Sequence, residues 1–205
     1  QSPVMTAQPH RPLLIVIAGP NGSGKTSITH RLLNHEWLED AVYINPDNVA
    51  QEVFGDWNSP EAVMKAVKHC EALREKCIQE KKSLIFETVL SGADKVDFIT
   101  RAAQAGYFIR IFFICTESPK INASRIAGRV MEGGHDVPLG KVISRYKKSI
   151  LNCKKLSPFV DRLYLYDNSP DGKEAAIQCR LTKGEVAKRY VDALPWWAER
   201  ILAAD

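Results

Sequence analysis

The chain has 205 residues, of which 45% are hydrophobic and 25% charged, values that are ordinary for a globular protein with a sizeable core. No apolar run approaches the ~20 residues that a membrane-spanning helix needs. The net charge of +4 fits anionic substrates but is too small to indicate a nucleic-acid-binding protein, so we expect neither a membrane protein nor a nucleic-acid partner.

The N-terminal residues 1–11 are polar and contain proline, and they lack the apolar segment of a signal peptide. We therefore expect a flexible N-terminal segment and a cytoplasmic protein. The five cysteines agree with a reducing compartment, because they form no C-x-x-C pair and most fall on apolar stripes, as core thiols do.

A phosphate-binding loop follows the first expected strand, residues 13–18. The sequence GPNGSGKT matches G-x-x-x-x-G-K-[ST] without a gap, between a strand and a helix as this motif requires. Its glycines allow backbone N–H groups to surround phosphate oxygens, and the positive end of the next helix points at the same anion. Lys25 would reach the β- and γ-phosphates, and the Thr26 hydroxyl would hold Mg²⁺. The predicted nucleotide-binding residues are Gly19, Pro20, Asn21, Gly22, Ser23, Gly24, Lys25, Thr26 and Ser27.

Strands and helices then alternate along the chain. This alternation predicts a parallel sheet with helices on both faces. The expected fold class is α/β, a P-loop NTPase three-layer sandwich with a mainly parallel five-stranded sheet. The expected strands are residues 13–18, 41–44, 83–87, 107–115 and 163–166, and the expected helices include residues 60–81, 93–105, 118–132 and 195–202.

The long helix expected over residues 60–81 has apolar residues at helical spacing, which predict a buried stripe. They are Val63, Ala66, Val67, Cys70, Leu73 and Cys77. Beyond the fifth strand, residues 175–181 and 185–190 are candidates for a hairpin, and Trp196 and Trp197 are expected to pack the terminal helix onto the sheet. We expect one kinase domain over residues 1–205, with a candidate arginine lid at 118–138 and a C-terminal extension at 172–205.

Ligands of parallel α/β sheets bind at the carboxyl ends of the strands, so the residues that follow each strand are the candidate site residues. Asp47 follows the second strand. Phosphoryl transfer to an alcohol needs a carboxylate that accepts the hydroxyl proton and orients the oxygen, which makes Asp47 a candidate catalytic base and substrate ligand. A turn or helix-capping aspartate suits the local sequence Asn-Pro-Asp-Asn equally well.

Glu87 and Thr88 end the third strand. An apolar strand that carries an acid to the ligand side indicates binding of a substrate hydroxyl, or support of Mg²⁺ through water. A hydrogen-bonded structural carboxylate is the alternative. The polar residues that follow Glu87 favour a pocket, and we place Thr88 with it as a substrate-binding candidate.

Arg125 and Arg129 are four residues apart and so lie on one face of the helix after the fourth strand. Phosphoryl transfer spreads negative charge over the migrating group, which an arginine lid would stabilise. A solvated basic face is the alternative, but the Gly-Gly that ends this helix suits a hinge and favours the lid. His135 is a candidate substrate contact, although a lone loop histidine is more often structural, and Arg145 is a second candidate for the phosphate.

These features together resemble the zeta toxin family of P-loop kinases, over about residues 13–169. The resemblance rests on the phosphate loop, the acid of Ile44-Asn45-Pro46-Asp47, the strand-ending Glu87 and the arginine-bearing segment 119–129. Glu87-Thr88-Val89 stands where the family usually has Glu-Gly-Thr.

The resemblance implies a kinase that transfers the γ-phosphate of ATP to a hydroxyl of a UDP-activated amino sugar, chiefly UDP-N-acetylglucosamine, and that a small antitoxin silences. It implies ATP–Mg²⁺ on Lys25 and Thr26; the sequence itself does not distinguish ATP from GTP. Asp47 would be the general base, Glu87 would bind the sugar, and Arg125 or Arg129 would stabilise the transferring phosphate.

Two other functions remain open from the sequence. The first is a P-loop kinase for another hydroxyl, such as that of an antibiotic, a nucleoside or a nucleic-acid 5′ end. The second is a nucleotide-dependent switch protein that phosphorylates no acceptor, which leaves Asp47 without a purpose.

Overall fold

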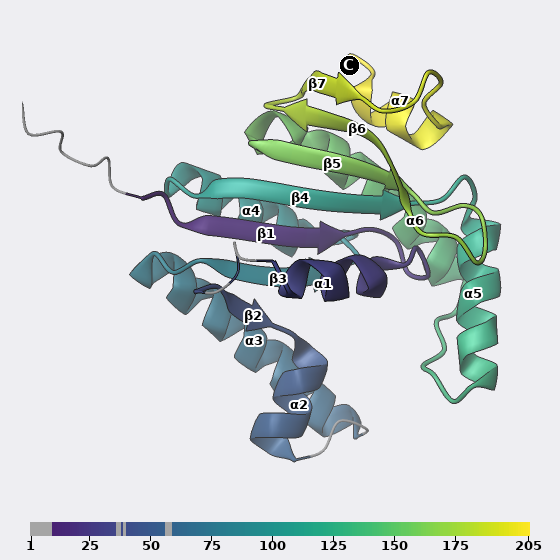
Figure 1. The fold of residues 1–205 in the computed structure, drawn as a ribbon. Coiled ribbons are helices and arrows are strands. Elements are labelled where there is room, and N and C mark those ends of the chain that lie inside the picture. The colour runs from purple at the N-terminus through teal and green to yellow at the C-terminus, as the bar shows by residue number, and fades with distance from the viewer. Residues whose placement is uncertain (1–9, 36–37, 39, 56–58) are drawn as a thin grey trace, which may run out of the picture.

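A single sheet runs through the molecule, with its strands in the order β2-β3-β1-β4-β5-β6-β7 (Figure 1). The computed structural model describes residues 10–35, 38, 40–55 and 59–205. The first five strands in chain order pair with one another in parallel, whereas β6 is antiparallel to both β5 and β7. The strands are β1 (Leu13–Ala18), β2 (Val42–Ile44), β3 (Leu84–Thr88), β4 (Phe108–Cys115), β5 (Arg162–Asp167), β6 (Ala176–Thr182) and β7 (Glu185–Arg189).

The predicted α/β fold with a mainly parallel sheet is confirmed, but the predicted number of five strands is wrong, because the described residues form a seven-stranded sheet. The two extra strands are β6 and β7, the hairpin expected near the C-terminus. Lys183 and Gly184 form its turn with φ angles of +50° and +84°, as a tight hairpin turn requires. Buried Cys179 and Leu181 continue the core beyond β5, so the hairpin extends the sheet.

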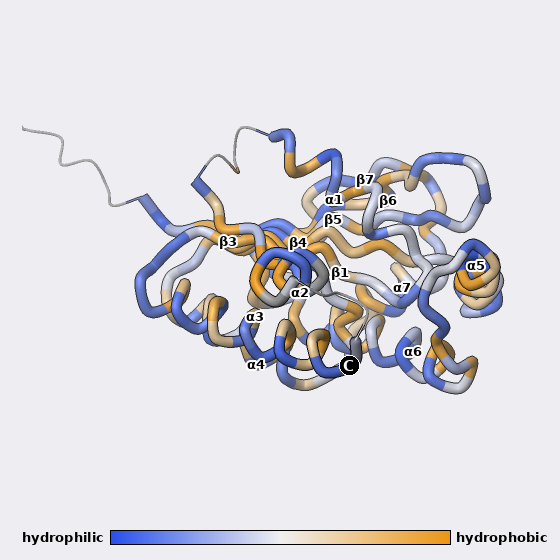
Figure 2. The backbone as a smooth tube through the Cα atoms, turned by 90° about the horizontal axis from the view of Figure 1, so that it is seen from below, coloured by the Kyte–Doolittle hydropathy of each residue, from blue (hydrophilic) through white to orange (hydrophobic). Residues whose placement is uncertain are grey.

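Helices cover both faces of the sheet (Figure 2). Helix α1 lies on one face, and α3, α4, α6 and α7 pack against the other. The helices are α1 (Lys25–Leu33), α2 (Pro46–Phe54), α3 (Pro60–Glu80), α4 (Ala93–Gln104), α5 (Pro119–Met131), α6 (Leu139–Leu156) and α7 (Trp196–Leu202), with a short 3₁₀ turn, η2 (Ser157–Phe159). In the described part of the chain, no helix is long and apolar enough to cross a membrane.

The apolar strands explain the layers. Side chains alternate along a strand, so Leu14 and Val16 of β1 face the α3–α4–α6 side, whereas Ile15 and Ile17 face α1. All four are fully buried. β1 lies between β3 and β4, so both of its edges are paired. Helices cover both of its faces. A continuous apolar run is typical of a strand in this position.

Of the two tryptophans expected to pack the terminal helix onto the sheet, only Trp197 does so. Trp197 is fully buried and packs against Phe113 of β4, with 5.8 Å between ring centroids. Trp196 is 51% exposed and contacts the ring of Tyr146 in α6 instead of the sheet, so the expectation for it is wrong. Seven residues form α7, and they place neighbouring side chains on different sides of the helix.

The parallel strands bring their carboxyl ends to one edge of the sheet, beside α5 (Figure 1). The phosphate loop follows β1 and Glu87 ends β3. Asp47 is the second residue of α2, which begins two residues after β2. The candidate site residues named from the sequence therefore share this edge by topology.

Candidate active site

The three glycines of the phosphate loop all have positive φ, and two of them, Gly22 and Gly24, allow the loop to approach neighbouring segments closely. Gly22 has φ +78°, and a Cβ there would lie 2.6 Å from the backbone oxygen of Asn122 in α5. Gly24 has φ +99°, and a Cβ there would lie 2.3 Å from the amide nitrogen of Asn168. Any other residue would be strained at both positions and would push the loop away from its supports. The two glycines let the loop pass close to α5 and to the segment after β5.

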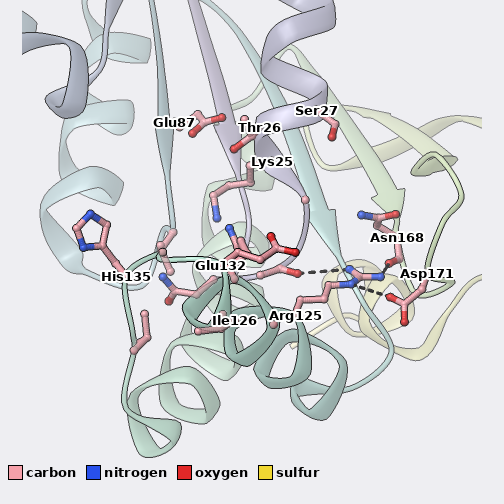
Figure 3. Close-up of a pocket in the computed structure, with 18 of the residues that line it drawn as sticks. Lys25, Thr26, Ser27, Glu87, Arg125, Ile126, Glu132, His135, Asn168 and Asp171 are labelled. Carbon is pink, nitrogen blue, oxygen red and sulfur yellow. Dashed lines mark hydrogen bonds and ion pairs between the residues drawn. The ribbon is translucent and has the colours of Figure 1, made fainter.

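Lys25 begins α1 and reaches back over the loop. Its ammonium group donates hydrogen bonds to the carbonyl oxygens of Gly19 at 2.7 Å and Pro20 at 3.1 Å. Desolvation lowers its pKa to about 8; nearby Glu87 opposes this shift, and the positive charge of Arg129 adds to it. Figure 3 shows the Lys25 side chain extending into the cavity. A half-buried cation held by neutral carbonyl oxygens is well placed to bind an anion.

Glu87 lines the same cavity as Lys25 and Thr26. The Thr29 hydroxyl, on the second turn of α1, donates a hydrogen bond to its carboxylate. This contact ties β3 to α1 and fixes the direction of the acid. Thr88 has a different environment: its hydroxyl accepts a hydrogen bond from the backbone N–H of Leu90 at 3.0 Å, and Thr88 is not among the described residues that line the cavity.

Arg125 holds the phosphate loop against the segment that follows β5. Its guanidinium donates to the carbonyl oxygen of Asn168 at 2.6 Å and to that of Gly22 at 3.3 Å, and it pairs with Asp171 at 3.1 Å (Figure 3). The amide of Asn168 in turn donates to the carbonyl of Ser23 at 2.9 Å. The donors of Arg125 are thus largely used by the protein itself, which suits a positioning role better than contact with a migrating phosphate.

Arg129 lies one turn further along α5 and lines the cavity as well. It makes no hydrogen bond or ion pair with any described residue, and its charge helps to lower the pKa of Lys25. Its carbonyl accepts a hydrogen bond from the N–H of Gly134 at 2.7 Å, at the turn where the chain leaves the helix. Of the two arginines, Arg129 has the guanidinium that is available to an incoming anion.

The remaining predicted residues are placed less closely around the loop. His135 lines the cavity on its α5–α6 side (Figure 3). Arg145 of α6 is within 3.5 Å of the side-chain oxygen of Asn21. The backbone of Asp47 is described as part of α2, but its side chain lies outside the described residues.

Sequence reasoning missed the wall formed after β5. Asn168, Pro170, Asp171, Gly172 and Lys173 line the cavity opposite Glu87 and His135. Asn168 directly follows a strand, so the rule that ligands bind at strand ends could have identified it. The others lie in a loop whose course no local pattern specifies.

The cavity has a volume of about 890 Å³, within the range of small-molecule sites. Its residues fit a triphosphate, because Gly22 and Gly24 of the phosphate loop, the half-buried Lys25 and Thr26 line one region of it. They also fit Mg²⁺ in its usual setting, where phosphates and water supply most ligands and the protein adds the Thr26 hydroxyl. The described residues include no cluster of three acidic, His or Cys side chains that could hold a metal by itself.

Comparison with known proteins agrees with this geometry. The sequence model of the zeta toxin family matches residues 1–155 of the 205. An uncharacterized protein of Haemophilus influenzae is 27% identical over 132 residues, which cover 64% of this chain and 91% of that protein.

Two solved structures are similar in fold. A structure from the PezAT chromosomal toxin–antitoxin system of Streptococcus pneumoniae has a TM-score of 0.60 at 21% identity, covering 84% of this chain and 74% of that one. The AvrRxo1-ORF1:-ORF2 complex with ATP has a TM-score of 0.67 at 16% identity, covering 95% of this chain and 64% of that one. With the phosphate loop intact and three quarters of the sequence matched by the family, the chain belongs to the zeta toxin family and is an ATP-dependent phosphotransferase with a P-loop kinase fold.

Proposed function

We propose that this protein is a Mg²⁺-dependent kinase that transfers the γ-phosphate of ATP to a hydroxyl of a nucleotide sugar such as UDP-N-acetylglucosamine. The observation that carries the proposal is the shared cavity of Lys25, Glu87 and Arg129. A site for phosphoryl transfer needs a phosphate grip, an acid near the acceptor and a cation for the migrating charge, and these three residues supply them from β1–α1, β3 and α5.

Each residue has a defined task in this proposal. Lys25 leaves the carbonyl oxygens of Gly19 and Pro20 to bind the β- and γ-phosphates, and Arg129 stabilises the charge that develops on the transferring group. Glu87, held by Thr29, binds an acceptor hydroxyl. Bound Mg²⁺, with Thr26 as a protein ligand, would neutralise phosphate charge.

Asp47 completes the proposal as the general base. It follows β2, which pairs with β3, and β3 in turn pairs with β1. Asp47 after β2 and Glu87 near the end of β3 therefore belong to adjacent strands, at the same edge as the phosphate loop. A carboxylate there would accept the proton of the acceptor hydroxyl and aim its oxygen along the line of transfer. No covalent intermediate on the protein is required.

The size of the cavity and the family support a nucleotide sugar as acceptor. About 890 Å³ is near the upper end of the usual range for small-molecule sites, so a second ligand could share the space with the triphosphate. The resemblance to the zeta toxin family implies a UDP-activated amino sugar as the acceptor, which supports the same assignment.

The test is transfer of label from γ-labelled ATP to a panel of acceptors: UDP-N-acetylglucosamine, other UDP-sugars, nucleosides, an aminoglycoside and an RNA with a 5′-hydroxyl. We expect label in the UDP-amino sugar with wild type and with the exposed control variant Asp192→Asn, and none with Lys25→Ala. Label only in a non-sugar acceptor would overturn the nucleotide-sugar assignment. Label in no acceptor, with nucleotide still bound, would overturn the kinase proposal.

We also propose that a small antitoxin protein binds and silences this chain. The names of the two similar structures describe a toxin–antitoxin system and a two-component complex, which supports a protein partner. Expression of wild type and of Lys25→Ala in bacteria tests the toxic part: growth arrest by wild type alone is expected. Arrest by both variants, or by neither, would contradict it.

A further inference from the structure

Part of the sheet is open on the face that carries α1. Helix α1 packs with residues of β1, β3 and β4, whereas α3, α4, α6 and α7 pack against the opposite face. No described helix covers β5, β6 and β7 on the α1 side, and Figure 1 shows their front surface uncovered. The outward side chains here form a surface that we call the open face, defined by Arg110, Arg162, Tyr164, Arg180 and Lys188.

The alternation of side chains along the strands places these residues on the same side. The core on the opposite face takes alternate residues of β5 and β6, namely Leu163, Leu165, Cys179 and Leu181. Arg162, Tyr164 and Arg180 lie between them and therefore point to the α1 side. Strand register places Arg110 of β4 beside Arg162, and Lys188 of β7 beside Arg180. Four cations thus adjoin one another across four strands.

The described acids do not neutralise these cations. Arg162 donates to neutral acceptors, the carbonyl of Asp161 at 3.0 Å and the hydroxyl of Thr182 at 3.1 Å. Arg180 and Lys188 form no ion pair with a described residue, and Nε of Arg180 is buried without a hydrogen-bond partner. A buried donor without a partner is costly, which favours a ligand that supplies an acceptor.

The open face therefore has an excess of positive charge. On the α1 side of β4–β7 the four cations stand against one acid, Glu185. Arg110 is the register partner of Arg162, and Arg180 that of Lys188, and like charges in such positions repel. A lysine on an edge strand can serve to block strand addition, but Arg162 and Arg180 lie on interior strands. A bound polyanion would relieve the repulsion.

Aromatic rings lie among the cations. The half-buried Tyr164 is the register partner of Arg180 and stacks on Phe112, with 4.5 Å between ring centroids and 10° between ring planes. The ammonium nitrogen of Lys188 lies 4.7 Å from the ring centroid of Tyr190, which is 39% exposed. Tyrosine rings beside cations on a sheet are typical of surfaces that stack unpaired bases and hold the phosphates between them.

We propose that the open face binds single-stranded nucleic acid, with phosphates on the four cations and bases on the tyrosine rings. An acidic protein segment would use the cations but leave Tyr164 and Tyr190 without a role, and a duplex keeps its bases stacked inside. The four cations do not line the nucleotide cavity, so the two sites are separate. The net charge of +4 did not indicate this partner, because it averages over all surfaces of the chain.

The test is fluorescence anisotropy with a short labelled oligothymidylate, titrated at several salt concentrations. Three or four phosphate contacts predict a slope of about −2 to −3 in a plot of log K against log salt. The triple variant Arg162→Gln, Arg180→Gln, Lys188→Gln should bind at least about tenfold more weakly at low salt and lose most of this slope. Circular dichroism checks its folding. Lys188→Glu, at an exposed position, tests the same face without touching half-buried Arg180, and should weaken binding severalfold.

Two controls separate this face from general attraction to a basic protein. The triple variant Lys141→Gln, Lys147→Gln, Lys148→Gln removes the same charge from exposed positions of α6 and should change the affinity by less than about twofold, because salt screens distant charges. Tyr190→Leu removes a stacking ring and leaves every charge in place. It should weaken binding severalfold and keep the salt slope.

Three results would overturn the proposal. The first is no binding of the oligonucleotide at low salt, or equal weakening by the two triple variants. The second is an oligoglutamate that binds more tightly than the oligonucleotide and is insensitive to Tyr190→Leu, which would assign the face to an acidic protein segment. The third is displacement of the oligonucleotide by Mg²⁺–ATP, which would place it in the nucleotide cavity. None of these measurements involves a transfer step, so their failure leaves the kinase proposal untouched.

Discussion

The guanidinium of Arg125 donates a hydrogen bond of 2.6 Å to the backbone carbonyl of Asn168, and through this contact α5 is joined to the segment after β5. The same side chain reaches the carbonyl of Gly22. The phosphate loop is therefore enclosed by two parts of the chain that are linked to each other. This arrangement separates the tasks of two arginines that the sequence alone places on one helix face.

Replacing Arg125 should weaken nucleotide binding. Arg125→Lys keeps the charge but cannot reach the carbonyl oxygens of Gly22 and Asn168 and the carboxylate of Asp171 at once. Loss of hydrogen bonds from a charged donor costs about 1.5–3 kcal/mol, or roughly 10–100-fold in affinity. Titration with a fluorescent ATP analogue measures the change, and Arg200→Lys serves as the exposed control. An unchanged Kd would show that the clamp does not shape the nucleotide site.

Replacing Arg129 should instead slow the transfer step. Because its guanidinium is free of described partners, we expect Arg129→Ala to lower kcat by about 10²–10³-fold, as removal of a donor to transition-state charge does. The Kd for ATP should change only a few fold. Single-turnover measurements with saturating ATP separate the two quantities. If Arg129→Ala instead weakened ATP binding as much as it slowed the transfer step, Arg129 would contribute to binding of ATP and not specifically to the transition state.

Asp47→Asn tests the proposed general base. The amide cannot accept the proton of the acceptor hydroxyl, so we expect kcat to fall by about 10²–10⁴-fold, the usual contribution of general base catalysis. Nucleotide binding should persist, because the phosphate loop is untouched. A variant with nearly full activity would assign Asp47 to the start of α2 as a capping residue only.

Nucleotide affinity should fall above pH 8. Lys25 has a pKa of about 8 in the free protein, and a bound triphosphate favours its charged form and so raises that value. Between the two pKa values binding takes up a proton, and affinity decreases by up to about tenfold per pH unit as pH rises. Calorimetry in buffers of different ionisation enthalpy measures this uptake. Lys25→Ala should bind weakly at every pH without the proton uptake; uptake that survives in this variant would assign it to another group.

The two adjacent tryptophans should differ in their effect on stability. The indole of buried Trp197 donates to Asp167 at 2.9 Å, so Trp197→Phe loses a hydrogen bond to a charged group and leaves unfilled space. We expect a loss of about 2–4 kcal/mol in the free energy of unfolding. Trp196→Phe, at a half-exposed position, should cost less than about 1.5 kcal/mol. Urea unfolding followed by circular dichroism compares them, and equal losses would contradict the assignment.

The sequence predicted the parts of the site that local backbone geometry specifies. The phosphate loop needs glycines at fixed positions and a lysine at the start of a helix, and the structure places Gly22, Gly24 and Lys25 accordingly. The direction of the Arg125 side chain could not be predicted, because its acceptors are far away in the sequence: Asn168 and Asp171 are 43 and 46 residues further along, and Gly22 is 103 residues earlier. Neither could the wall formed after β5, whose backbone follows no periodic pattern.

The stripe predicted on α3 is correct only in part. Ala66, Cys70 and Cys77 are buried, but Val63 and Val67 are 38% and 36% exposed. Figure 1 shows why: the first turns of α3 extend past the sheet together with α2, so the stripe has no strand to cover there. Helical periodicity identifies the inner face of a helix but not the length over which a neighbour packs on it.

The family match ends at residue 155, near the end of α6, while the sheet continues. β4 has a complete set of neighbours only because β5 pairs with it along six residues. A fragment trimmed to the matched region would leave the unpaired backbone of a strand rich in Ile and Phe open to solvent, a ready template for intermolecular strand addition. For this molecule, the most recognisable stretch of sequence is thus shorter than the smallest piece that we expect to stay monodisperse.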